Sequence, residues 1–218
     1  MYNFHACERN ASLLTYLFYR RILKAVMTDN ENIDKKSDEE LAVLTLRNQD
    51  FFACLMRRYE AKLLRYIRRI SGVSLEEAED VLQDSFIKIY QNLNGFDRSL
   101  KFSSWAYRIT HNQVISHFRK NQVRPQTSAF DSELLETLAS DLDSARDIDR
   151  KLLRERLEKT LEKIDTKYRD VLVLKYFEEK DYQEISDIMQ KPMGTVATLL
   201  SRAKRLLKAE LNNLNISL

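Results

Sequence analysis

Glycine and proline are scarce in this chain, and the scarcity limits the folds that it can adopt. Three Gly and two Pro occur among the 218 residues. Strands joined by tight turns depend on these residue types, so an all-β fold is disfavoured. Charged residues make up 32% of the chain and hydrophobic residues 44%, a mixture typical of amphipathic helices with one buried and one solvated face. The sequence therefore predicts an all-α protein.

Local signals place four helices in the first half of the chain. Ser37, with Glu40 three residues later, forms a capping box, which predicts that a helix begins there. Glycines and serines mark the boundaries of the next helices. The expected boundaries are residues 50–70 ended by Gly72, residues 75–93 capped by Ser74 and ended by Gly95, and residues 105–121 capped by Ser103 or Ser104.

Composition divides the chain into four parts. Residues 1–36 read as an N-terminal extension that is either disordered or upstream of a true start at Met27, with a short extra helix as the alternative. Residues 37–120 should form a helical bundle. Residues 121–150 carry seven acidic and three basic side chains, a net charge of −4, and few bulky apolar ones, so they are expected to form a flexible linker. Residues 151–218 should form a second small helical domain.

The last part of the chain has the pattern of a helix-turn-helix. Its final helix carries an apolar stripe spaced by four, three and four residues, and Pro192 fits the first turn of that helix. The other face is polar and basic, so it could lie in a major groove. A plain helical hairpin with a solvated basic face is the alternative. The candidate DNA-reading residues are Thr195, Thr198, Ser201, Arg202 and Arg205.

The stretch DYQEISDIMQKPMGTVATLLSRAKRLLK resembles region 4 of the extracytoplasmic-function (ECF) sigma factors. The resemblance implies that this domain reads the minus-thirty-five promoter element and touches the polymerase beta flap. The family commonly has Gly at Gln190 and basic residues at Ala197 and Leu199, and the loss of those charges should weaken DNA contacts there.

The expected helix over residues 75–93 has acidic and amide side chains along one face. Such a face suits a basic protein surface, because complementary charge steers docking. A merely solvated face is the alternative, and a metal site is disfavoured because no His accompanies the acids. The sequence resembles sigma region 2.2, which implies docking on the beta-prime clamp helices. The candidate polymerase-binding residues are Glu79, Asp80, Gln83, Asp84 and Phe86.

Residues 95–120 mix aromatic and basic side chains, a combination that suits single-stranded DNA because rings stack on bases while cations follow the backbone. The alternative is that Trp105 and the Phe rings form core. His111 and His117 are expected to be exposed. The segment resembles sigma regions 2.3 and 2.4, although Ser116 stands where Asp is frequent. The implied minus-ten residues are Arg98, Lys101, Phe102, Ser103, Trp105, Arg108, Asn112, Arg119 and Lys120.

Together the two resemblances predict an ECF sigma factor that directs promoter recognition, minus-ten strand opening and initiation. Its implied partners are core RNA polymerase and promoter DNA, with an anti-sigma factor as a further candidate, and the linker would enter a basic channel of the polymerase. A stand-alone DNA-binding regulator is the alternative. No catalytic set, metal site or cofactor motif is evident, so we expect neither an enzyme nor a cofactor. Two isolated cysteines and the lack of a long apolar run predict a cytoplasmic protein without membrane insertion.

Overall fold

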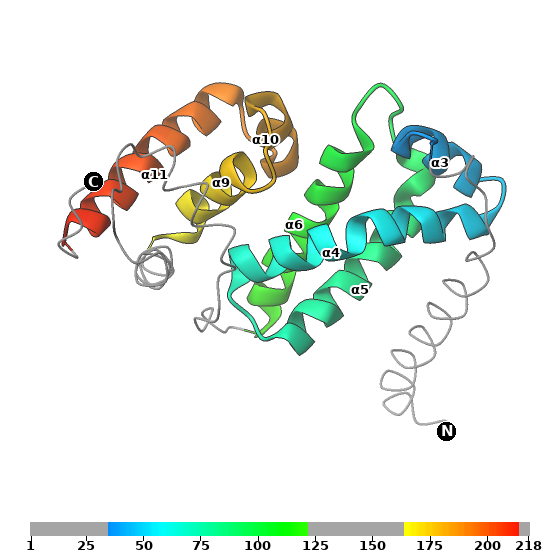
Figure 1. The fold of residues 1–218 in the computed structure, drawn as a ribbon, viewed down its shortest axis with the longest axis horizontal. Coiled ribbons are helices and arrows are strands. Elements are labelled where there is room, and N and C mark those ends of the chain that lie inside the picture. The colour runs from blue at the N-terminus through cyan, green and yellow to red at the C-terminus, as the bar shows by residue number, and fades with distance from the viewer. Residues whose placement is uncertain (1–34, 122–163, 214–218) are drawn as a thin grey trace.

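The computed structural model describes residues 35–121 and 164–213, which form helices joined by short loops and contain no strand (Figure 1). The predicted all-α class is confirmed for this part of the chain. The N-terminal extension, with the predicted start at Met27, and the acidic linker lie outside the described residues. The helices, in chain order, are α3 (Asp38–Thr45), η2 (Gln49–Phe51), α4 (Phe52–Ser71), α5 (Leu75–Asn92), η3 (Leu93–Gly95), α6 (Phe102–Asn121), α9 (Thr166–Tyr176), α10 (Tyr182–Met189) and α11 (Met193–Asn213).

Ser37, Ser74 and Gly72 set helix boundaries as the sequence predicts, and both serines form capping boxes. Ser37 Oγ accepts a hydrogen bond from the Glu40 amide at 3.1 Å, and the Ser37 amide donates to the Glu40 carboxylate at 2.9 Å. Ser74 and Glu77 form the same reciprocal pair at the start of α5. Gly72 ends α4 in the left-handed conformation, with φ 68°, which glycine adopts without steric cost.

The start of α6 differs from the prediction. The helix begins at Phe102, three residues before the expected Trp105, so neither Ser103 nor Ser104 caps it. The Phe102 amide instead donates to the Glu39 carboxylate at 2.9 Å, from the distant helix α3. A carboxylate at a helix N-terminus satisfies a free amide and opposes the positive end of the helix dipole. Because this cap comes from another element, the local sequence does not reveal it.

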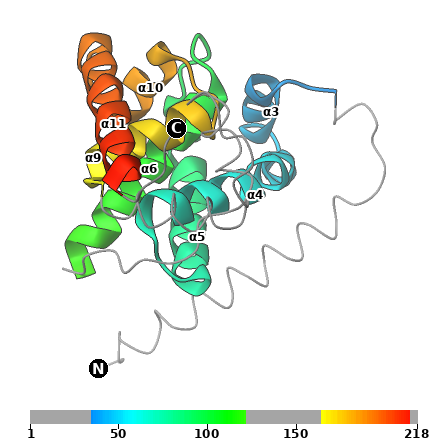
Figure 2. The same cartoon turned by 60° about the vertical axis from the view of Figure 1, so that its left-hand side comes forward.

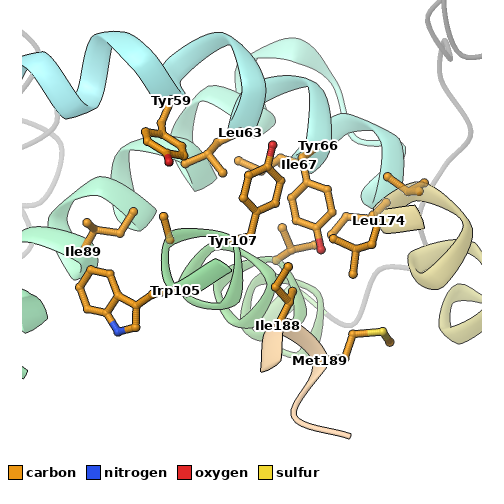
Figure 3. Packing of buried hydrophobic residues seen from close by; sticks show 14 of the residues in the cluster. Tyr59, Leu63, Tyr66, Ile67, Ile89, Trp105, Tyr107, Leu174, Ile188 and Met189 are labelled. Atoms are coloured by element: carbon orange, nitrogen blue, oxygen red, sulfur yellow. The ribbon is translucent and has the colours of Figure 1, made fainter. Parts of the chain in front are cut away.

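The N-terminal block, α3 to α6, is a bundle with a dense core. Leu63, Tyr66 and Ile67 of α4 are fully buried, and Ile89 of α5 and Trp105 of α6 pack from the other helices (Figure 3). Aromatic rings fill the end of this core near the start of α6. The bundle therefore holds α5 and α6 rigidly, with one face of each turned outward.

The helices α10 and α11 form the predicted helix-turn-helix. Ile185 and Ile188 of α10 and Val196 of α11 are completely buried. Gln190, where the family commonly has Gly, occupies the turn in the left-handed conformation, with φ 53°. This conformation costs about 1 kcal/mol more for Gln than for Gly, which has no Cβ. The side-chain amide of Gln190 donates to the Asp187 carbonyl at 2.7 Å, which offsets part of that cost.

The two helical blocks pack against each other in this structure. Helix α10 lies along α6, and α9 lies against the end of α4, as both views of the ribbon show (Figures 1 and 2). Leu174, Ile188 and Met189 extend the core of the first block into the second without a break (Figure 3). This packing places the start of the helix-turn-helix directly over α6.

Candidate polymerase and nucleic-acid interfaces

The outer face of α11 carries the five residues predicted to meet the minus-thirty-five element. Val196 and Leu200 face the core, with 0% and 2% exposure, and fix the orientation of the helix. The predicted face is exposed along its whole length: Thr195, Thr198, Ser201, Arg202 and Arg205. Ala197 is also exposed, whereas Leu199 is half-buried and packs on the core, so a charge at position 199 would be only partly available to DNA.

Helix α5 presents the predicted acidic face to solvent. Glu79, Asp80 and Asp84 are exposed and Gln83 is half-buried. Phe86 is buried, with 5% exposure, and packs edge-on against Phe52, so it supports this face from beneath rather than contacting a partner directly.

Sequence reasoning missed an apolar residue in the middle of the acidic face. Ile87 is 38% exposed and lies one turn after Asp84, on the same side of α5 as Asp80. A single exposed apolar side chain is ordinary on a protein surface, so Ile87 does not by itself mark an interface. The signal was present in the sequence, because Ile87 stands outside the buried helical stripe that ends in Ile89.

The aromatic rings near the start of α6 are core residues. Phe102 is 1% exposed and Trp105 is 6% exposed, and both pack on Phe96, with ring centroids 5.5 and 5.2 Å away. They are therefore not available for stacking on bases in this structure, and the core alternative holds for them.

The polar residues predicted to meet the minus-ten element remain at the surface. Arg98, Lys101, Asn112 and Arg119 are exposed, and Ser103 and Arg108 are half-buried; Lys120 lies in the last turn of α6, beyond the described side chains. The surface is therefore a set of cations and amides built over an aromatic core.

His111 contradicts the expectation of an exposed side chain. It is 4% exposed, and its Nδ1 lies 3.0 Å from the hydroxyl of Tyr66. Its Nε2 faces Asp170 of α9 at 3.9 Å, which is too long for a hydrogen bond. Burial lowers the pKa of His111 to about 4 and raises the pKa of Asp170 to about 8. Both groups are therefore neutral near pH 7, which lowers the cost of burying them.

This pair predicts that stability falls as pH rises from about 6.5 to 8. A carboxyl whose pKa is raised by folding stabilises the folded state while it stays protonated, and that contribution is lost as pH rises through about 8. His111, with its lowered pKa, acts in the opposite direction only below about pH 6.5. We expect Asp170→Asn to flatten the fall in unfolding free energy, which approaches about 1 kcal/mol per pH unit in the unmodified chain.

Urea denaturation at several pH values between 6.5 and 8 measures this slope. Asp50→Asn is the matched control, because Asp50 is exposed and is not among the charges that shift the pKa of Asp170. Equal slopes for the Asp170→Asn variant and the unmodified chain would show that Asp170 titrates below this range.

Within residues 35–121 and 164–213, no group of three or more His, Cys, Asp or Glu side chains could hold a metal ion. The same part of the chain has no helix that is both long and apolar enough to cross a membrane. The candidate site consists of three separate surfaces: the acidic face of α5, the polar start of α6 and the outer face of α11.

Two family models match the two helical blocks in order. Sigma-70 region 2 matches residues 55–124, and Sigma-70, region 4 matches residues 154–207. Helices α4 to α6 belong to the first match, and α9 to α11 belong largely to the second. The fold and the surfaces thus define a transcription initiation factor of the sigma-70 class.

Relatives narrow the class. The ECF RNA polymerase sigma factor SigW of Bacillus subtilis is 34% identical over 182 residues, which cover 77% of this chain and 92% of SigW. The RNA polymerase sigma-H factor of Pseudomonas aeruginosa is 31% identical over 79% of this chain and 92% of its own. The chain belongs to the ECF family of RNA polymerase sigma factors. It directs promoter recognition, minus-ten strand opening and transcription initiation by core RNA polymerase.

Solved structures share the fold. The structure of CnrH in complex with the cytosolic domain of CnrY aligns with a TM-score of 0.61 at 24% identity, over 82% of this chain and 99% of that one. The sigma factor RpoE in complex with the anti-sigma factor NepR, from Bartonella quintana, aligns with a TM-score of 0.57 at 20% identity, over 74% and 96%. Both likenesses support the all-α architecture.

Proposed function

We propose that this sigma factor divides its work among three surfaces of named residues. The acidic face of α5 docks on the beta-prime clamp helices through Glu79, Asp80, Gln83 and Asp84, with Phe86 supporting it from the core. The outer face of α11 reads the minus-thirty-five element. The cations and amides of α6 and the loop before it hold the opened minus-ten strand. One observation carries the proposal: α5 and α11 expose chemically different faces, acidic with an apolar centre and polar with basic residues.

We further propose the domain roles and setting that follow from this division. Residues 37–120 form the polymerase-docking and strand-opening domain, residues 121–150 the linker that enters the polymerase channel, and residues 151–218 the promoter-reading domain that touches the beta flap. The protein acts in the cytoplasm as a binding factor without catalysis of its own. An anti-sigma factor is a proposed further partner, in keeping with the complex of the structural neighbour RpoE.

A pair of substitutions should separate the first two surfaces. Asp84→Lys places a like charge opposite a basic partner surface and is expected to weaken core polymerase binding by more than about tenfold. Arg202→Ala removes a cation from the exposed face of α11 and is expected to weaken promoter duplex binding by the holoenzyme by about tenfold. Each variant should leave the other interaction nearly unchanged.

Fluorescence titration of core polymerase and of duplex DNA measures both affinities. Asp50→Lys and Arg47→Ala are matched controls, because both residues are exposed and belong to neither α5 nor α11. If Asp84→Lys binds core polymerase as tightly as Asp50→Lys does, the acidic face of α5 is not the docking surface.

A further inference from the structure

The first turn of α10 contacts one end of the strand-opening surface of the same molecule. Lys101, a proposed minus-ten contact, lies 3.4 Å from the Glu184 carboxylate and 3.9 Å from that of Asp181. The hydroxyl of Ser104 donates to Glu184 at 3.2 Å. Lys180, in the loop before α10, reaches Ser103 Oγ at 3.2 Å. Residues at the start of α6 are thus already engaged by the promoter-reading domain.

A cleft of about 180 Å³ opens between the two blocks at this point. Its walls have opposite charge: Lys101 and Arg108 belong to the first block, and Asp181, Glu184 and Asp187 belong to the second. Trp105 forms part of its lining. A DNA strand that reached the two cations would have its phosphates next to three carboxylates, which repel them. The acidic wall therefore competes with DNA for the same cations.

Buried interactions hold this arrangement in place. Arg69 of α4 bridges to Glu178 at 3.1 Å, with both side chains 7% exposed, and the Tyr107 hydroxyl of α6 donates to the same carboxylate. Ile188 of α10 is completely buried in the shared core. Buried, paired charges together with apolar packing indicate a specific interface rather than a loose surface contact.

The other two functional surfaces stay open. The acidic face of α5 and the outer face of α11 are exposed in the same structure. Among the three surfaces, the contact between α10 and α6 therefore engages residues of the strand-opening surface alone. It leaves polymerase docking and duplex reading possible while the strand-opening residues are held.

We propose that the carboxylates of α10 form an intramolecular lock on the strand-opening surface, and that promoter melting requires α10 to leave α6. The lock consists of Asp181 and Glu184, paired with Lys101 and Ser104. It rests on the proposed minus-ten role of Lys101. Its consequence is that the free protein binds single-stranded DNA weakly and duplex DNA normally.

The test is the double variant Asp181→Asn/Glu184→Gln. Both replacements keep the capping box of α10, because Asn caps well and Gln can replace Glu at the third position. The matched control is Asp165→Asn/Glu179→Gln, which makes the same change in net charge at two exposed positions outside the cleft. The probes are fluorescent oligothymidylate and a random duplex of equal length, and the whole chain is used.

The lock variant is expected to bind oligothymidylate about 5- to 30-fold more tightly than the control variant, because several partly exposed ion pairs are removed together. Duplex affinity should be the same for the two variants. Adding Lys101→Ala to the lock variant should abolish the gain. Circular dichroism confirms that the helices remain.

Two results would overturn the lock. The lock variant and the control variant could gain the same affinity for oligothymidylate, which would mean that the change in net charge alone causes the gain. Alternatively, the gain in affinity could persist after Lys101→Ala is added. A different result points to the DNA surface itself. If holoenzyme that carries Lys101→Ala opens a promoter as well as the unmodified holoenzyme does, the proposed minus-ten surface is misplaced, and the lock built on it falls with it.

Discussion

Phe102→Ala is expected to lower the free energy of unfolding by about 3–5 kcal/mol. The ring is 1% exposed, and its centroid lies 5.5 Å from that of Tyr59 and 5.7 Å from that of Trp105. Truncation to a methyl group loses the burial of the ring and leaves a cavity among side chains that cannot collapse freely. The loss should also disturb the start of α6 and, through it, the strand-opening surface.

Urea denaturation of the variant measures this loss, and Arg98→Ala is the control for stability because that side chain, close by in the chain, is exposed. Phe102→Leu should recover most of the stability and most of the oligothymidylate binding, since an aliphatic side chain refills much of the space. A different pattern would revive base stacking by this ring: unchanged stability in Phe102→Ala together with lost single-strand binding.

Signals that act within a few residues were readable from the sequence. The capping box at Ser37, the cap at Ser74 and the helix end at Gly72 depend on neighbouring atoms, and all three are found as expected. The apolar spacing of α11 likewise separated the buried Val196 and Leu200 from the exposed face. Periodicity reports which side of a helix is apolar, and in these helices the apolar side is the buried one.

Signals that depend on tertiary contact were not readable. The cap on Phe102 comes from Glu39, far away in the chain, so the start of α6 was placed three residues too late. His111 looked like an exposed helix residue, because nothing near it in sequence shows that Tyr66 and Asp170 surround it. The aromatic and basic mixture at α6 fitted both stacking and core packing, and only the burial of the rings decides between them.

The packing between the two blocks is the largest feature that local patterns could not show. Glu178 and Glu184 each look like ordinary solvated acids in the sequence. In the structure, Glu178 is nearly buried against Arg69, and Glu184 accepts a hydrogen bond from the Ser104 hydroxyl. A charge run gives no sign of which distant side chain will pair with it. The interface is specified by the match of two surfaces, and neither surface alone encodes it.

Arg69→Ala is therefore expected to lower the free energy of unfolding by about 3–5 kcal/mol. The guanidinium bridges to Glu178 and lies over the ring of Phe177, 4.9 Å from its centroid. Its removal leaves the Glu178 carboxylate buried with the Tyr107 hydroxyl as its remaining partner among these groups. An unpaired buried carboxylate is costly, because the protein interior solvates it poorly.

The double variant Arg69→Met/Glu178→Gln separates the pair from the packing. Replacing both charges by neutral side chains of similar size should restore much of the stability lost in Arg69→Ala, because no charge is then left unpaired. Urea denaturation of both variants and the unmodified chain measures the difference. A loss below about 1 kcal/mol in Arg69→Ala is the value typical of a solvated ion pair. It would mean that the two blocks lie apart in solution, so that α10 could not hold the strand-opening surface of α6.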